Sequence, residues 1–314
     1  MSWIIVALSG YALMAVASVF DKFLLSERRL ASPARYAFLV SLMNLPFLVL
    51  IPFGIVLFLP SAAAVGIVSG AAFLFSLLTL YRAVKQSEVS RSVPIAGAVS
   101  VGFMFALSIA VGTSIGRGIT FVEVVAIGLL VGGAALLSSG GIGVRGPGFV
   151  RYVVLSGALN ALSFILLRES YLLSNFVTGF VWSKVGMLLA GLSILLVPSW
   201  RKELSSVPKR SSKARPRRSP GTMAAFVATQ VFGGSGTILV SYAVSLGSAT
   251  LVQGMAGAQY GLVFLIASVL SVRFPAVFRE HIGHAETVRK LSAIGLIALG
   301  IWLSALSGSG TNLL

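Results

Sequence analysis

A lysine inside an apolar run is the residue best placed to do chemistry in this sequence. Lys184 follows Trp182 and Ser183, part of the way into the apolar stretch 177–199. An ionisable group within a lipid-solvated segment costs a few kcal/mol, so it is a functional candidate by default. We expect Lys184 to bind an anionic group or to exchange a proton, with Trp182 in the same site. The open alternative is that Lys184 snorkels to the interface and Trp182 belongs to the aromatic belt.

Amides, hydroxyls and tyrosines recur in the other apolar runs. Gln230 precedes the glycine-rich segment 233–236, so it is expected either to hydrogen-bond a solute or to stand in a helix contact made by small residues. Tyr81 and Tyr242 occupy similar places in the two halves of the chain and are candidate gates or interface aromatics. Lipid penalises unpaired polar groups, so the remaining ones should face a cavity or a protein partner. These are Asn44, Asn160, Ser163, Gln253, Gln259 and Tyr260.

Other ionisable residues give weaker indications. Asp21-Lys22 and Arg168-Glu169 are expected to be interfacial pairs of opposite charge, with Asp21 also a candidate for a coupling proton. His281 and His284 are too few for a metal site, which usually needs three or four ligands. The sequence has no cysteine and no Ser/His/Asp set or phosphate-binding glycine loop within the apolar runs. It predicts no enzyme activity, cofactor or metal.

Composition identifies lipid as the main solvent. Of 314 residues, 57% are hydrophobic and 10% are charged, whereas about 25% of residues in soluble domains are charged. The length leaves room for about ten crossings of some 20 residues each. A net charge of +16 raises the possibility of nucleic-acid binding. The Lys and Arg residues lie between apolar runs instead of forming a basic face with aromatics, so no nucleic acid is expected.

The apolar runs predict helices, because they are too long for strands and lack period-two alternation. All but three of the 24 Lys and Arg residues fall in odd-numbered connections. This asymmetry predicts cytoplasmic odd loops, with both termini outside, in a plasma or inner membrane. The first run lacks a signal peptide's basic region and is taken as a retained helix. The predicted helices cover about 3–21, 34–57, 62–83, 92–112, 119–138, 150–168, 177–199, 222–245, 250–272 and 288–306.

The connection at 200–221 differs from the others in length and composition. It is rich in Lys, Arg, Ser and Pro and poor in apolar residues, which favours a disordered cytoplasmic linker. A patch that binds anionic lipid head groups is the alternative.

Short motifs repeat in the same order along the two halves of the chain. They include Ala83-Val84 with Ala243-Val244, Ala96-Gly97-Ala98 with Ala256-Gly257-Ala258, and Ala126-Ile127-Gly128-Leu129 with Ala293-Ile294-Gly295-Leu296. We therefore predict two five-helix repeats, 1–140 and 150–306, with the second interrupted by the basic loop. An odd number of helices per repeat reverses the sense of the second, giving the inverted-topology architecture of many secondary transporters.

Three segments resemble the EamA-like branch of the drug/metabolite transporter superfamily. Residues 81–94 resemble that family's junction of third and fourth helices, 242–253 its counterpart in the second half, and 274–295 its passage into the last helix. The resemblance implies a ten-helix carrier of small organic solutes and no particular substrate. Many relatives carry a glutamate after the fourth helix; residues 111–117 contain none, while the second half keeps Glu280.

The sequence thus predicts a secondary active transporter working by alternating access. Its partners would be a small-molecule or lipid-linked substrate and membrane lipids. A flippase for a lipid or lipid-linked sugar on the same architecture is the alternative, and it would need a lateral opening to the bilayer. Without a nucleotide-binding motif, ATP drive would require another protein. The central cavity is expected to be lined by Lys184, Gln230, Gln253, Gln259 and Tyr260.

Overall fold

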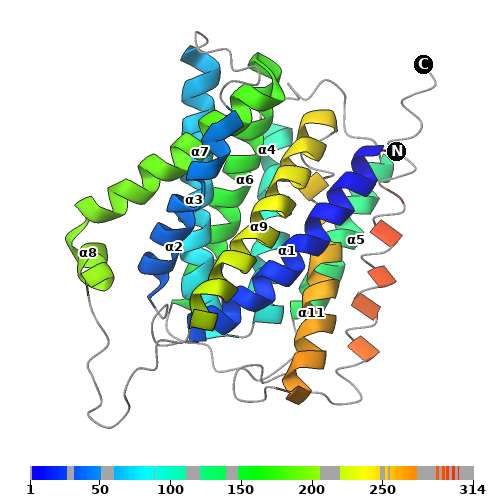
Figure 1. Ribbon diagram of the computed structural model, residues 1–314. Helices are drawn as coiled ribbons and strands as arrows, with labels where there is room; N and C mark the ends of the chain where they lie inside the picture. The colour runs from blue at the N-terminus through cyan, green and yellow to red at the C-terminus, as the bar shows by residue number, and fades with distance from the viewer. Residues whose placement is uncertain are drawn as a thin grey trace.

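The computed structural model describes residues 2–26, 32–50, 60–87, 89–110, 121–138, 148–205, 220–247, 252–253 and 255–273, with isolated positions between 288 and 303. Every regular element in these ranges is helical, which confirms the all-α prediction (Figure 1). The α-helices are α1 (Ser2–Ser26), α2 (Pro33–Leu42), α3 (Pro60–Gln86), α4 (Val89–Ala110), α5 (Phe121–Ser138), α6 (Phe149–Leu173), α7 (Phe176–Ser193), α8 (Pro198–Ser205), α9 (Pro220–Leu246) and α11 (Ala256–Arg273). Two 3-10 helices, η1 (Leu45–Leu50) and η2 (Ile194–Leu196), continue α2 and α7.

Five of the described helices are long and apolar enough to cross a membrane, judged by length and composition. At a rise of about 1.5 Å per residue, a crossing takes roughly 20 residues. The apolar stretches are Trp3–Leu24, Pro60–Gln86, Phe149–Leu173, Phe176–Leu196 and Ala224–Leu246. Shorter apolar helical stretches lie at Ile95–Met104, Val124–Gly133 and Ala256–Leu270. These helices fit a multi-pass membrane protein; the count of ten crossings and the orientation of the loops stay predictions.

The segment predicted as one helix over 34–57 is interrupted, so that prediction is wrong. Helix α2 ends at Leu42, and η1 begins at Leu45. Pro46 has no N–H to donate, and its ring disfavours the helical conformation at Leu45. The Asn44 amide donates to the Val40 carbonyl at 2.8 Å, which satisfies a carbonyl at the helix end. The break keeps Asn44 in the interior, where it is buried.

The beginning of the basic connection is also ordered differently from the prediction. Residues 200–205 belong to helix α8 and residues 220–221 to α9, so the prediction of irregular chain is wrong for them, while 206–219 lie outside the described residues. Arg35 Nη2 donates to the Leu204 carbonyl at 2.8 Å, and Arg82 Nη2 lies 3.7 Å from Glu203 Oε1. These contacts hold α8 against α2 and α3.

Small residues let α3 lie directly on α7. A Cβ added at Gly70 would overlap the Ser183 carbonyl, and one added at Gly186 would overlap the Ile67 carbonyl. A Cβ at Gly66 would lie 2.9 Å from the Trp182 Cβ. Such close approach requires the absence of a side chain at these glycines.

Helices α3 and α6, and likewise α1 and α9, form the longest contacts between neighbours (Figure 1). Between α3 and α6, the Ser76 hydroxyl donates to the Ser156 carbonyl at 2.9 Å. Between α1 and α9, Gly10 and Gly236 face each other closely. A Cβ on Gly10 or on Gly236 would lie 2.9 or 2.7 Å from the carbonyl oxygen of the other. Hydroxyl bonds and close glycine contacts of this kind are typical of helix packing in membrane proteins.

Candidate functional site

Lys184 lies in the interior of the helix assembly, with 3% of its surface exposed. Its Nζ lies 4.7 Å from the ring centroid of Phe180, one turn earlier on α7, and 5.2 Å from that of Phe47 in η1. Helix α7 starts at a capped end, where Asn175 Oδ1 accepts from the Thr178 N–H at 2.8 Å. The alternative that Lys184 snorkels to the interface is wrong, because the side chain points inward.

A cavity of about 150 Å³ surrounds the Lys184 ammonium and extends between α1, α2, η1, α3, α4, α7, α9 and α11. Its apolar wall includes Met14, Phe47, Leu77 and Met187. Its polar lining comes from Ser18, Asp21, Asn44, Tyr81, Lys184, Thr229, Gln230, Thr237 and Gln259. A cavity of this kind, mostly apolar with convergent polar groups, is typical of a site for a small ligand.

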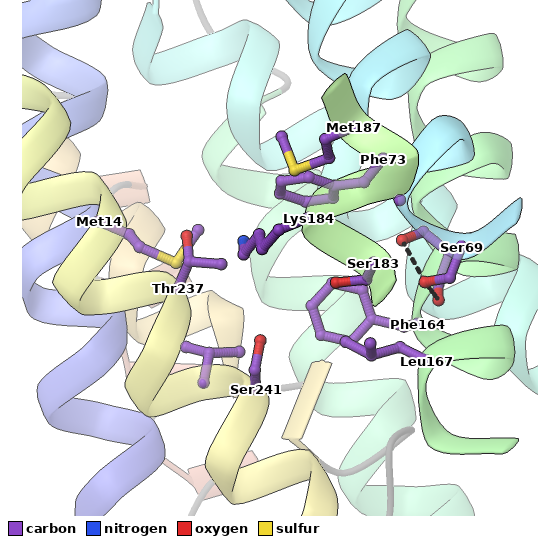
Figure 2. Close-up of a pocket in the computed structure, with 13 residues that line it drawn as sticks. Met14, Ser69, Phe73, Phe164, Leu167, Ser183, Lys184, Met187, Thr237 and Ser241 are labelled. Carbon is purple, nitrogen blue, oxygen red and sulfur yellow. Dashed lines mark hydrogen bonds between the residues drawn. The ribbon is translucent and has the colours of Figure 1, made fainter. Parts of the chain in front are cut away.

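A smaller pocket of about 30 Å³ adjoins the cavity and shares Lys184, Met14 and Thr237 with it. Figure 2 shows Lys184 extending from α7 toward Met14 of α1 and Thr237 of α9. The opposite wall carries Ser69 of α3, whose hydroxyl donates to the Ser163 carbonyl at 2.8 Å. The ammonium therefore faces the meeting point of α1, α7 and α9.

Asp21 of α1 lines the cavity together with Lys184. The Tyr36 hydroxyl donates to Asp21 Oδ1, and the Tyr36 ring meets the edges of Tyr81 and Phe226 at centroid distances of 4.8 and 5.5 Å. No ion pair joins Asp21 to any residue in the described part of the chain. A tyrosine in an aromatic cluster thus fixes this carboxylate at the cavity wall.

Neither expected interfacial pair forms a salt bridge in the described part of the chain, although Glu169 does interact electrostatically with Arg168. Lys22 Nζ donates to the carbonyls of Val84 and Ser87, both at 2.7 Å, at the end of α3. Arg168 Nη1 donates to the carbonyls of Val244 and Ser245, at 2.9 and 2.6 Å, at the end of α9. The prediction that Asp21 and Lys22 compensate each other is wrong, because Lys22 bonds the carbonyls at the end of α3 and Asp21 accepts from Tyr36.

Five of the eleven candidate residues line the cavity: Asn44, Tyr81, Lys184, Gln230 and Gln259. Ser163 lines the smaller pocket. Gln259 Nε2 donates to Ser18 Oγ at 3.1 Å, joining α11 to α1 at the cavity wall. Gln230 makes no side-chain hydrogen bond within the described ranges, so its amide is available to a solute.

Three of the other predicted residues gather away from the cavity, around α4. Asn160 Nδ2 and Gln253 Nε2 both donate to Ser100 Oγ, at 3.1 and 3.3 Å. Gln253 Oε1 is buried without a partner in the described part of the chain. The Tyr260 hydroxyl lies against Gly97, where no Cβ would fit. Gln253, Asn160 and Tyr260 therefore contact other helices, which is the protein-partner alternative, and Gln253 and Tyr260 are not among the residues that line the cavity.

The last two predicted residues are peripheral. Trp182 is half-buried against Gly66, and its indole N–H has no acceptor among the described residues. Tyr242 is 43% exposed, with its ring edge on Phe176 at 5.4 Å between centroids. His281 and His284 lie outside the described residues, and the described part of the chain holds no metal-binding cluster of three or more such ligands.

Sequence reasoning missed several residues of the cavity wall. Thr237 lies seven residues, or about two helical turns, after Gln230, with Gly233 and Gly234 between them on the same face. That spacing was readable as one polar face of a helix. Ser18 was missed in the same way, three residues before Asp21 on α1, whereas Asp21 itself was already a candidate for a coupling proton. The aromatic Phe47 had no such signal, because its place depends on the break before Pro46.

Comparison with known proteins adds information on the fold alone. No protein-family model matches the chain, and no curated protein matches it. A solved structure described only as a crystal structure of a protein aligns with 97% of this chain and 96% of its own. Its TM-score is 0.63 at 14% sequence identity. The helix arrangement therefore occurs in an experimentally determined protein of nearly the same extent.

Proposed function

We propose that this chain is a secondary active transporter that moves a small organic solute by alternating access. The observation that carries the proposal is Lys184, a cation with 3% of its surface exposed that faces a cavity of about 150 Å³ and has no acidic partner in the described ranges. A buried charge without a partner is strongly destabilising. A ligand of opposite charge would compensate the buried lysine, so a residue that destabilises the ligand-free protein would serve to bind that ligand.

The packing supports two related halves. Helix α1 lies along α9 and against α11, while α6 lies along α3 and against α4. Under the predicted equivalence of 1–140 and 150–306, α6, α9 and α11 are the counterparts of α1, α3 and α4, so each contact has its counterpart. The two cations that bond helix ends match in the same way: Lys22 of α1 bonds the end of α3, and Arg168 of α6 bonds the end of α9. An inverted repeat of this kind is the basis of alternating access.

The same arrangement supports membership of the EamA-like branch of the drug/metabolite transporter superfamily as part of the proposal. So does the placement of Tyr81, from the first segment that carries the resemblance, at the cavity wall. The cytoplasmic position of the odd loops and a plasma or inner membrane location belong to the proposal too.

The volume of the cavity favours a small solute over a lipid-linked sugar. An apolar cavity of about 150 Å³ holds a molecule the size of benzene. A lipid-linked substrate would need a groove open to the bilayer along its acyl chain, so the flippase alternative is the weaker one.

Alternating access can be tested without knowing the substrate, because the chain has no cysteine of its own. Single variants Ser18→Cys and Thr237→Cys place a thiol in the cavity wall, and Ser76→Cys, between α3 and α6, serves as the buried control. Each is labelled with a membrane-impermeant thiol reagent in right-side-out and inverted vesicles.

We expect the two cavity thiols to react from both sides of the membrane and the control thiol from neither. Labelling from one side should also block later labelling from the other, since both reach the same sulfur. Cavity thiols that react from a single side only would rule out alternating access and leave a static scaffold or receptor.

A further inference from the structure

The cavity carries two ionisable groups of opposite sign that do not meet. Asp21 and Lys184 both line it, and no ion pair joins them. Each has unused capacity. Tyr36 occupies one oxygen of the carboxylate, and two aromatic rings lie beside the ammonium. In a purely structural site of low dielectric, opposite charges are expected to approach and neutralise each other.

The two groups are separated along the length of α1. Met14 lies next to Lys184, since both line the smaller pocket (Figure 2). Asp21 follows Met14 by seven residues, which corresponds to a rise of about 10 Å along the helix. The two groups therefore stand at different heights of one cavity, with the basic group of Lys184 at one end and the acidic group of Asp21 at the other.

The wall between the two ends combines aliphatic and hydrogen-bonding groups. Leu77 and Val40 offer apolar surface, and Gln230 offers an amide with no partner in the described part of the chain. An anion alone would leave Asp21 uncompensated, and a cation alone would do the same to Lys184. A solute that carries both charges satisfies both ends at once.

We propose that the cavity takes a small, elongated zwitterion, with its carboxylate or other anionic group at Lys184 and its ammonium at Asp21. This inference rests on the proposed function, since it names the substrate class of the transport site. An ω-amino acid with a short methylene chain has this pattern: two charged ends and an apolar stem.

The test compares three probes of equal length on the purified protein: 5-aminopentanoate, pentanoate and pentylamine. Dissociation constants come from ligand-dependent thermal unfolding, because a ligand of the native state raises its stability by mass action. The zwitterion is expected to bind at least about tenfold tighter than either singly charged probe. It should also bind tighter than glycine, whose charges are too close together to reach both ends.

Two variants assign the ends. Asp21→Asn should remove the difference between 5-aminopentanoate and pentanoate, and Lys184→Met should remove the difference between 5-aminopentanoate and pentylamine. Lys184→Arg, which keeps the charge, should restore binding. If a variant fails to fold, the comparison of the three probes on the wild-type protein still tests whether the cavity prefers a zwitterion.

Equal binding of pentanoate and 5-aminopentanoate would overturn the proposal and leave Asp21 for another role, such as carrying a proton. Absence of a shift with every ω-amino acid from glycine to 6-aminohexanoate would overturn it as well. Thiol labelling of Ser18→Cys and Thr237→Cys needs no ligand. A protein that passes that experiment and fails this one remains a transporter of a different substrate class.

Discussion

Two groups of polar side chains lie inside the helix assembly, and they differ in what they bond. Around Ser100, the amides of Asn160 and Gln253 donate to one hydroxyl, and α4, α6 and the chain just before α11 are joined. Around the cavity, Lys184 and Gln230 face empty space with no hydrogen-bond or ionic partner in the described ranges. In lipid, a polar group that bonds a neighbouring helix stabilises the fold. One that faces a cavity is available to a ligand.

This difference separates two interpretations that the sequence left open for every polar residue at membrane depth. We call Ser100, Asn160 and Gln253 the packed cluster. Substitutions in the packed cluster should lower stability and leave ligand binding unchanged. Substitutions in the cavity should weaken ligand binding without lowering stability. The predictions below test that opposition by thermal unfolding of the purified protein without ligand, unless another measurement is named.

The largest effect is expected at Gly97. Gly97→Ala places a methyl group on the Tyr260 hydroxyl, so either the Tyr260 side chain must move or α4 and α11 must separate. Overpacking of this kind costs about 3 kcal/mol. Because the same two residues cause the loss, the double variant with Tyr260→Ala should lose less than the two single losses combined. Strict additivity would mean that the contact is absent.

Removing the shared hydroxyl of the packed cluster comes next. Ser100→Ala leaves the buried amides of Asn160 and Gln253 without their acceptor, at a cost of about 2 kcal/mol. Ser193→Ala is the matched control, because its hydroxyl bonds only the Ala190 carbonyl of its own helix. If the two variants lose equal stability, the packed cluster contributes nothing specific.

In the cavity, a substitution is expected to raise the stability of the protein instead of lowering it. Lys184→Met removes a buried charge with no ionic partner and should raise the stability of the ligand-free protein by about 1 kcal/mol. Ligand binding should be lost at the same time, which is the usual conflict between stability and function at a site. Lys184→Arg keeps the charge and should show no gain. A clear loss of stability in Lys184→Met would assign the lysine a structural role.

The smallest effect compares the two glutamines. Gln230→Leu breaks no hydrogen bond in the described part of the chain and should change stability by no more than about 0.5 kcal/mol. Gln253→Leu breaks the bond to Ser100 and should cost about 1 kcal/mol. Equal losses at the two positions would remove the distinction between cavity and packed cluster.

Much of the fold was predictable because its causes are local. The long apolar runs at 62–83, 150–168 and 222–245 appear as α3, α6 and α9, each slightly longer than predicted. The exception at Leu42 had a local cause as well, since Asn44 and Pro46 are neighbouring signals of a helix end. The prediction relied on the hydrophobicity of the whole run and so overlooked these two residues.

The sequence alone determined that this chain is helical, that its apolar runs fit a multi-pass membrane protein and that Lys184 needs an explanation, because composition and the cost of a buried charge depend on residue type. Tertiary structure decided which polar groups share a cavity. Gln259 and Tyr260 are adjacent in the sequence, yet Gln259 lines the cavity beside Ser18, whereas Tyr260 packs on Gly97. Successive helical side chains point about 100° apart, and the rotation of each helix follows from packing against its neighbours. Asp21 belongs to the site for the same reason: Tyr36, on another helix, holds it there.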